Sequence, residues 1–249
     1  MNDTLLSLKR AANFMLDLVF PPKCIFCNTI LTPGVTLQIC PECYDKIPFV
    51  QGKVCETCGQ VIDTAYGPEK CLDCRDVRHY FEKNISPCEY KGMMRDAMVR
   101  FKFFKKRWYA KTLGQLMLKK LRKMKNLPIF DIIVYTPLYK KRLSERGFNQ
   151  AKLLAKVIAQ ELPCSLGENI LLKIKDTQPQ SKLTRSQRRK NIKDAFQISD
   201  ETVVKGKTVL LVDDVYTTGT TVDECSKLLK RAGAKEVYVV TTAIGKGIY

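Results

Sequence analysis

Short apolar runs and stretches with helical spacing alternate along the second half of the chain. Residues 131–135 and 209–212 are largely apolar and contain β-branched side chains, a pattern typical of strands buried in a parallel sheet. Residues 149–160 and 222–232 instead have apolar positions at helical spacing, and Gly233 follows the second stretch as a stop signal. The pattern therefore predicts two buried strands, each followed by a helix.

Two other segments of this half have distinct patterns. Leu113, Leu116, Met117 and Leu121 continue at helical spacing, which predicts a helix with one buried face. Residues 176–191 are polar and basic without apolar periodicity, which predicts a flexible loop.

The N-terminal stretch is too polar for a membrane segment. Lys9, Arg10 and Asp17 interrupt residues 5–20, which also lack a small-residue cleavage site, so we do not expect a secretory signal. No apolar run in the chain reaches the ~18–20 residues that a membrane helix needs. We therefore expect an N-terminal helix and no membrane insertion.

The net charge of +18 is concentrated in one part of the 249-residue chain. Residues 1–80 contain 8 Lys and Arg against 9 Asp and Glu, whereas residues 81–249 contain 35 against 16. Residues 100–125 and 182–193 contain basic side chains without acidic ones. Unopposed positive charge indicates a polyanionic partner, either a phosphate compound or a nucleic acid. The alternative is a solvated helix face, although such faces usually include acidic residues for pairing along the helix.

Eight of the 11 cysteines form an internal repeat of the C-x-x-C type. Shifting the first four by 31 positions gives the last four: Cys24, Cys27, Cys40 and Cys43, then Cys55, Cys58, Cys71 and Cys74. Two such pairs supply the four thiolates of a structural zinc site, so the repeat predicts two zinc ribbons with four cysteine ligands each.

Other interpretations of these cysteines are weaker. Disulfides need an oxidising compartment, and a redox C-x-x-C usually occurs once. The duplication favours one ion for each 31-residue unit, while a cross-braced pairing of the first and third pairs stays open. Reduced cysteines indicate a cytoplasmic protein, and the single histidine, His79, excludes sites that need two.

Residues 207–221 contain the most informative motif, an apolar strand that leads through acidic and hydroxyl residues into a helix. Such a geometry directs backbone N–H groups and the positive end of the helix dipole at one point, where a phosphate binds. The threonine hydroxyls complete a cradle, and Gly219 permits close approach of the backbone. Asp213 and Asp214 would accept hydrogen bonds from ribose hydroxyls, so a sugar phosphate fits both halves of the motif.

Two other phosphate-related sites fit this motif less well. The chain has no G-x-x-x-x-G-K-[ST] sequence, which excludes the ordinary nucleotide-hydrolase loop. A response-regulator acidic pocket would explain the two aspartates but not the threonines.

The segment VLLVDDVYTTGTT resembles the phosphoribosyl pyrophosphate (PRPP) signature of type I phosphoribosyltransferases. Residues 135–138, 146–150, 177–181, 188–191 and 195–196 are similar to the ComF family of competence-associated proteins, whose members also begin with a cysteine-knuckle domain. The resemblance implies an α/β fold with a parallel sheet flanked by helices, preceded by a small double zinc ribbon. It implies domains at residues 1–80 and 81–249, with a linking segment near residues 79–87.

The resemblance also implies which residues bind PRPP and its Mg²⁺. The PRPP-binding residues would be Asp213, Asp214, Val215, Tyr216, Thr217, Thr218, Gly219, Thr220 and Thr221. Candidates for the pyrophosphate are Lys102, Arg142, Arg146, Asn149 and Gln150, and candidates in a closing loop are Gln178, Arg185, Arg188, Arg189 and Asn191. A capped helix start with solvated basic residues and a plain surface loop are the respective alternatives.

Residues 101–109 interleave aromatic and cationic side chains, as in sequence-tolerant binding of single-stranded nucleic acid. The alternative is that the aromatic residues pack in a core while the lysines are solvated. ComF resemblance favours single-stranded DNA as a partner, together with other DNA-uptake proteins.

The resemblance leaves three functions open. They are a PRPP-binding accessory factor in DNA uptake during natural transformation, an active transferase acting on a nitrogen nucleophile, and an adaptor with a vestigial PRPP site. Cys24 is the first cysteine, inside a knuckle, so glutamine-dependent amination by this chain is excluded.

Overall fold

The computed structural model describes residues 15–62, 69–178 and 183–245 of the chain. The chain forms two compact units, Met1–Ile47 and Pro48–Tyr249. In the first unit, residues 15–19 are helical, and the rest of the expected N-terminal helix lies outside the described residues. The short helix α2 (Pro41–Asp45) follows Cys40 and begins with a proline, which suits the first turn of a helix.

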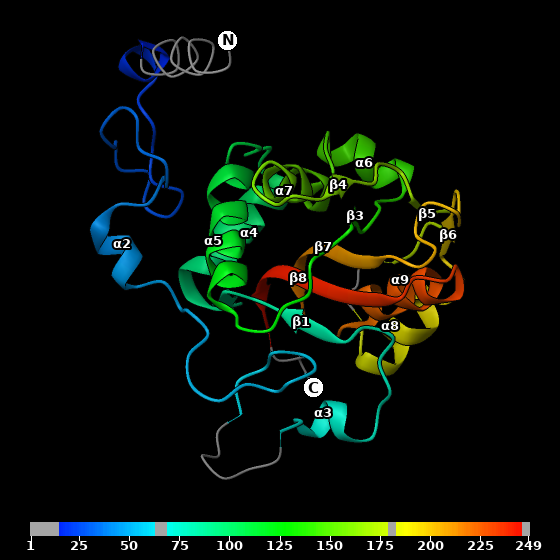
Figure 1. Ribbon diagram of the computed structural model, residues 1–249. Coiled ribbons are helices and arrows are strands. Elements are labelled where there is room, and N and C mark those ends of the chain that lie inside the picture. The colour runs from blue at the N-terminus through cyan, green and yellow to red at the C-terminus, as the bar shows by residue number, and fades with distance from the viewer. Residues whose placement is uncertain (1–14, 63–68, 179–182, 246–249) are drawn as a thin grey trace. The chain divides into compact units, whose positions relative to one another are not determined.

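The second unit is built on a parallel sheet with the strand order β1-β8-β7-β3-β4 (Figure 1). Its central strands are β7 (Thr208–Tyr216) and β8 (Glu236–Ile244), and β3 (Ile132–Tyr135) pairs with the other side of β7. The outer strands are short: β1 (Lys83–Ile85), β2 (Cys88–Glu89), which also pairs with β8, and β4 (Ser165–Leu166). Strands β5 (Leu171–Lys173) and β6 (Phe196–Ile198) form a separate antiparallel pair.

Helices cover both faces of the sheet (Figure 1). On one face lie α4 (Gly92–Phe103), α5 (Tyr109–Lys123) and α7 (Gln150–Ala159), and on the other lie α8 (Arg185–Ile192) and α9 (Thr220–Arg231). The helices α3 (Leu72–Arg75) and α6 (Lys140–Arg146) are shorter. Gly114 lets α5 and α7 pack closely, because a Cβ there would lie 2.7 Å from Val157 Cγ1.

The strands expected at residues 131–135 and 209–212 and the helices expected at 149–160 and 222–232 are confirmed. The four residues 209–212 have 0% exposure, and the side chains predicted at helical spacing in α5 are buried. Strand β7 is longer than its apolar run, because pairing with β8 continues to Tyr216 and Ile244. Asp213 and Asp214 therefore lie within β7, and Asp213 is paired with Thr241 of β8.

The linker expected near residues 79–87 is wrong. This segment contains β1, which pairs in register with residues 238–240 of β8, and Phe81, which is 3% exposed. A strand of three residues has too little pattern to be recognised without its partner strand.

The loop expected over residues 176–191 is wrong for residues 185–191, which belong to α8. Thr184 and Gln187 form a reciprocal capping box at its start, and Ile192 at its end is 2% exposed. Residues 179–182 lie outside the described residues.

The second group of four cysteines packs with the sheet, on the C-terminal side of the unit boundary at residues 47 and 48, whereas the sequence predicts a domain boundary at residue 80. Cys55, Cys58 and Cys74 belong to the same buried cluster as the apolar residues of β7 and α9. The second ribbon is therefore part of the compact unit that contains the sheet.

Candidate functional site

Both groups of four cysteines have the geometry of a zinc site. In each group the four Sγ atoms lie within 4.8 Å of one another, and the groups follow the sequence: Cys24, Cys27, Cys40 and Cys43, then Cys55, Cys58, Cys71 and Cys74. The Sγ atoms of Cys27 and Cys40 are 3.6 Å apart, as are those of Cys58 and Cys71. A tetrahedral ion with Zn–S bonds of ~2.3 Å separates its sulfurs by ~3.8 Å, whereas a disulfide needs ~2.05 Å. The cysteines fit one structural zinc ion per unit, paired sequentially.

The acidic doublet, Asp213 and Asp214, lies at the carboxyl end of the central strand β7. Asp213 Oδ1 accepts hydrogen bonds from Thr136 Oγ1 at 2.7 Å and from the backbone N–H of Asp214 at 2.8 Å. Burial, and secondarily the charge of Asp214, raise the pKa of Asp213 to about 7. Asp213 is thus held in one orientation by β3 and its own strand, and its ionisation is costly without a ligand.

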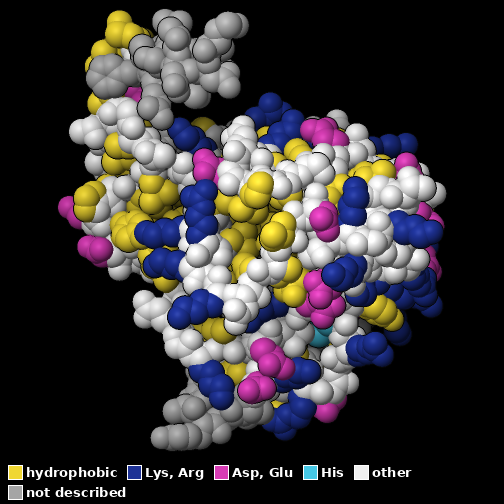
Figure 2. Space-filling model, viewed as in Figure 1, with side chains coloured by type: hydrophobic (Ala, Val, Ile, Leu, Met, Phe, Trp, Pro, Cys, Tyr) yellow, Lys and Arg dark blue, Asp and Glu magenta, His cyan; other side chains and the backbone are white. Residues whose placement is uncertain are grey.

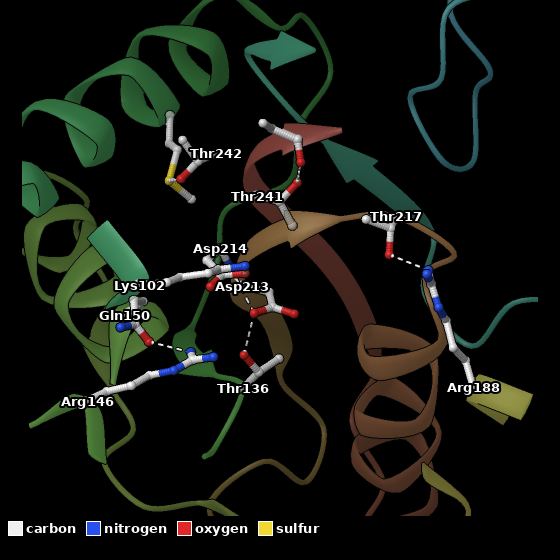
Figure 3. A network of polar contacts seen from close by, with 12 residues as sticks. Lys102, Thr136, Arg146, Gln150, Arg188, Asp213, Asp214, Thr217, Thr241 and Thr242 are labelled. Atoms are coloured by element: carbon white, nitrogen blue, oxygen red, sulfur yellow. Dashed lines mark hydrogen bonds and ion pairs between the residues drawn. The ribbon is translucent and has the colours of Figure 1, made fainter. Parts of the chain in front are cut away.

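Asp214 pairs with a lysine from a helix on one face of the sheet. Lys102 Nζ in α4 lies 3.1 Å from Asp214 Oδ1, and both side chains are largely buried. Figure 3 shows Lys102 and Arg146 reaching toward the doublet from one side, while Arg188 lies on the other side at Thr217. The fold therefore places a cation directly beside the acidic doublet, although Lys102 and Asp214 are far apart in the sequence.

The threonine-rich turn between β7 and α9 has the form of a phosphate cradle. Gly219 is the N-cap of α9 with φ of 72°, and it has no side chain that could bind the first N–H groups of the helix. The hydroxyls of Thr218 and Thr220 lie 2.9 Å apart, and Arg188 Nη1 donates to Thr217 Oγ1 at 3.2 Å. Helix N–H groups, hydroxyls and a guanidinium are thereby gathered at one helix N-terminus, an arrangement that favours an anion.

Tyr216 supports this turn from below. Its side chain is buried, with the residue 5% exposed, and a Cβ on Gly219 would clash with the ring and with the phenolic oxygen. The Tyr216 ring therefore supports the turn by packing against Gly219, while Thr217–Thr221 contribute the hydrogen-bond donors. Val215 lies in the paired part of β7 opposite Ala243.

Arg146 and Gln150 lie together, at the ends of α6 and α7. Arg146 Nη1 donates to Gln150 Oε1 at 3.0 Å, and burial lowers the pKa of Arg146 while the charge of Asp214 opposes that effect. Gln150 is 1% exposed, and its Nε2 has no hydrogen-bond partner among the described residues. Asn149 has a structural task, because it caps α7 at Lys152 N and donates to Thr136 O at 2.9 Å.

Two of the remaining candidates, Arg142 and Gln178, line a pocket between α6 and residues 176–178. Arg142 donates to Thr177 O, and this pocket of about 300 Å³ is lined by Lys141, Arg142, Glu145, Asp176, Thr177 and Gln178. Asn191 of α8 is paired with the backbone of Gln178 through two hydrogen bonds, of 3.0 and 3.1 Å. Arg185 and Arg189 lie on α8, and their side chains are outside the described part of the chain.

Lys173 in β5 is a neighbour of the site that the sequence did not reveal. Burial lowers its pKa to about 8, the charge of Arg142 adds to this effect, and Asp213 acts in the opposite direction. Its Nζ lies 5.5 Å from the centre of the Phe196 ring. No motif marks this lysine, because the antiparallel pair β5–β6 brings it to the site.

Two family models match the chain. The double zinc ribbon domain matches residues 15–76, and the phosphoribosyl transferase domain matches residues 149–247. Competence protein F of Haemophilus influenzae is 30% identical over 223 residues, which cover 87% of this chain and 94% of that protein. The chain belongs to the competence protein F family.

Other relatives match this family member over nearly their full length. The DNA utilization protein YhgH of Escherichia coli is 30% identical over 89% of this chain and 96% of that protein. The competence protein ComFC of Streptococcus pneumoniae is 27% identical over 86% of this chain and 96% of that protein. The fold of this family member is a phosphoribosyltransferase-type parallel sheet with a double zinc ribbon. Among the described residues, no helix combines the length and hydrophobicity needed to cross a membrane.

Proposed function

We propose that this protein binds PRPP and acts in the cytoplasm as an accessory factor in the uptake of single-stranded DNA. The observation that carries the proposal is the site at the end of β7. There an oriented acidic doublet and an uncapped helix N-terminus are joined by one continuous turn.

The two ends of the turn suit the two ends of a ribose phosphate. The N–H groups at the start of α9 and the hydroxyls of Thr217, Thr218, Thr220 and Thr221 would bind the 5′-phosphate. Asp213 and Asp214 would accept hydrogen bonds from the ribose hydroxyls, with Lys102 shifting from Asp214 toward the ligand. Hydrogen bonds to a charged acceptor are the stronger kind, which offsets the cost of ionising Asp213.

The pyrophosphate would lie toward the basic residues on the α6 side of the site. Arg146 is half-buried and Gln150 is buried there, and Gln150 Nε2, which has no partner among the described residues, is a donor that a phosphate oxygen would satisfy. Mg²⁺ bound with PRPP would neutralise charge on the pyrophosphate. Arg188 would add a donor at the opposite side, beside Thr217.

The DNA-binding part of the proposal rests on the segment between α4 and α5. Phe103, Phe104 and Trp108 are 63%, 64% and 37% exposed, so their rings are available to bases, and Lys105 and Lys106 are exposed between them. Lys and Arg side chains are also spread over the face of the molecule drawn in Figure 2. Stacking with bases and attraction to phosphates would hold single strands without sequence preference.

Titration calorimetry with PRPP and excess Mg²⁺ tests the first part. We expect binding by the wild type and at least about a tenfold weaker association for Asp213→Asn/Asp214→Asn, which removes charged hydrogen-bond acceptors. Glu201→Gln/Glu236→Gln is the matched control, because it removes the same charge before β7 and at the start of β8. Absence of heat with the wild type would refute the proposal.

Transfer of the phosphoribosyl group to a nitrogen nucleophile is the second candidate. A nucleophile needs room beside the PRPP site, and the 300 Å³ pocket next to Arg142 offers it. Release of pyrophosphate with a panel of nucleobases would separate an enzyme from a ligand-binding accessory protein.

A further inference from the structure

The second zinc ribbon is attached to the sheet by its own backbone. In its first knuckle, Thr57 O accepts from Asn84 N at 2.7 Å, and Cys58 O accepts from Asn84 Nδ2 at 2.9 Å. Gly59 has φ of 77°, and a Cβ there would lie 2.8 Å from Asn84 O. Asn84 belongs to β1, so the knuckle is joined to an outer strand of the sheet.

His79 connects the other knuckle of this ribbon to α9. Its Nε2 lies 3.5 Å from Cys74 Sγ, and its Nδ1 lies 3.3 Å from Asp223 Oδ1. The same carboxylate oxygen accepts from the backbone N–H of Tyr80 at 2.9 Å. A zinc ligand and the first turn of α9 thus share one buried imidazole, whose side chain is 6% exposed.

A second connection runs through aromatic rings. The His79 ring packs against Phe81 with 4.9 Å between centroids, and Phe81 packs edge-on against Tyr216 at 6.2 Å. Tyr216 is the residue beneath Gly219, and one small hollow is lined by Cys58, Cys74 and His79 together with Tyr216, Thr217 and Thr218. The ribbon therefore lies directly against the threonine turn.

The pairing of Asp223 also affects what the helix N-terminus can bind. A free carboxylate in the first turn is attracted to the unpaired N–H groups there and would compete with a ligand phosphate. His79 and the Tyr80 N–H hold this carboxylate instead, and no side-chain oxygen of the N-cap takes those groups.

We propose that the second zinc ribbon, through His79 and Asp223, holds the turn 217–221 in its phosphate-binding conformation, so that zinc at this site and phosphate at the turn bind cooperatively. His79 and Asp223 are positioning residues in this scheme. The inference rests on the proposed PRPP site and names the element that regulates it. Because coupling between sites is reciprocal, PRPP should in turn tighten the binding of this zinc ion.

Hydrogen exchange of the amides in residues 217–223, measured on full-length protein, tests the bracing without any ligand. Cys71→Ser disrupts the second site and Cys40→Ser makes the same change in the first. We expect exchange at least about tenfold faster in Cys71→Ser and unchanged in Cys40→Ser. Unchanged exchange in both variants, or equal acceleration, would overturn the inference.

Asp223→Ala and Asp223→Asn test the connection itself with both zinc sites intact. The asparagine amide oxygen can still accept hydrogen bonds from Tyr80 N–H and His79, so we expect the amides of Asp223→Asn to exchange as slowly as those of the wild type. In Asp223→Ala they should exchange about tenfold faster, which corresponds to the loss of one hydrogen bond to a charged group. This pair also decides the matter if Cys71→Ser fails to fold. Equal exchange in the two Asp223 variants would reject the role of His79 and Asp223.

The reciprocal measurement is an equilibrium competition for zinc with a zinc-binding dye, with and without PRPP. PRPP should tighten the binding of one zinc ion, the one absent from Cys71→Ser, by the same factor by which loss of that ion weakens PRPP binding. PRPP that binds without changing the affinity of either zinc site would overturn the cooperativity. A wild type that binds no PRPP would refute the proposed function alone, since the exchange data judge the bracing independently.

Discussion

At the scale of single residues, Asp213 is the group of the site whose orientation and pKa depend most on the fold. Thr136 and its own strand fix its orientation, while burial and the neighbouring Asp214 raise its pKa to about 7. A group whose folded-state pKa lies above its unfolded value binds a proton on folding, so stability falls as pH rises from about 4 to 7. Above that range the full cost of the buried charge is present.

Asp213→Asn should therefore stabilise the ligand-free protein at pH 8 and leave its stability nearly unchanged at pH 3.5, below the unfolded pKa of 3.8. Asparagine keeps the oxygen that accepts from Thr136 and from Asp214 N–H, and it removes the charge. The expected gain at pH 8 is on the order of 4 kcal/mol, since the pKa rises from 3.8 to about 7 and one pKa unit corresponds to ~1.4 kcal/mol. Chemical denaturation at the two pH values measures it, and an equal effect at both would contradict the assignment of the raised pKa to Asp213.

The conformation of Gly219 is the second residue-scale requirement. Gly219 and Gly206 both have φ of 72°, but only a Cβ at Gly219 meets a neighbour, the Tyr216 ring, whereas at Gly206 nothing lies within 4 Å. Substitutions at Gly219 and Gly206 therefore separate the cost of backbone strain, which both share, from the cost of contact with the Tyr216 ring, which occurs only at Gly219.

Gly219→Ala should lose PRPP binding and more stability than Gly206→Ala. The strain of a left-handed alanine costs about 1–3 kcal/mol at either position, and displacement of Tyr216 adds to it at Gly219 only. Thermal unfolding of both variants, with PRPP titration alongside, gives the comparison. Equal losses of stability in the two variants would mean that the Tyr216 ring moves aside at no cost and does not support the turn.

At the scale of elements, the sequence predicted what lies within one continuous segment. The cysteine repeat and the turn after β7 hold all their groups within a few dozen residues, so spacing alone identified both. The contacts Lys102–Asp214, Arg188–Thr217 and His79–Asp223 join residues far apart in sequence. They depend on the order of strands in the sheet, which no local pattern encodes.

Helix α8 begins with a capping-box sequence, which by itself was too weak to predict the helix. Thr184 and Gln187 have the spacing of a capping box, and the structure forms both of its hydrogen bonds. The helix lacks an apolar stripe because one of its buried side chains is Arg188, 4% exposed, which faces Thr217 instead of a hydrophobic core. A buried face that includes a polar side chain interrupts the hydrophobic periodicity, so the pattern alone does not reveal this helix.

At the scale of the molecule, the two ribbons are alike in sequence and different in surroundings. Cys27 of the first is exposed, whereas Cys58 of the second is 4% exposed and belongs to the main hydrophobic cluster. The residues that make this difference, such as Phe81 and Tyr216, lie outside the repeat. The duplication could predict two zinc sites but not their different environments.

Zinc should therefore assay at two ions per chain, with unequal consequences of losing each. Cys58→Ser should lower the melting temperature of the sheet-containing unit by on the order of 10 °C, because a structural zinc site in its core contributes folding free energy. Cys27→Ser, the matched change in the first unit, should shift that transition little. Scanning calorimetry with metal analysis tests this, and similar shifts for the two variants would contradict the difference in packing.

The exposed aromatic and basic segment between α4 and α5 predicts salt-dependent binding of single-stranded DNA. Lys105→Gln/Lys106→Gln removes two phosphate contacts and should reduce the slope of log affinity against log salt by ~1.4. Arg107 is unsuitable for this test, because its guanidinium donates to Gly147 O and lies 5.2 Å from the Phe148 ring centre.

The matched control for this pair is Lys205→Gln/Lys235→Gln, at exposed positions before β7 and β8. It removes equal charge and should leave the salt slope nearly unchanged, because these lysines lie outside the aromatic segment. Phe104→Ala should weaken binding at every salt concentration, by ~1–3 kcal/mol for one stacked base. Equal slopes for the two lysine pairs would mean that net charge alone attracts DNA and that the segment is not its binding surface.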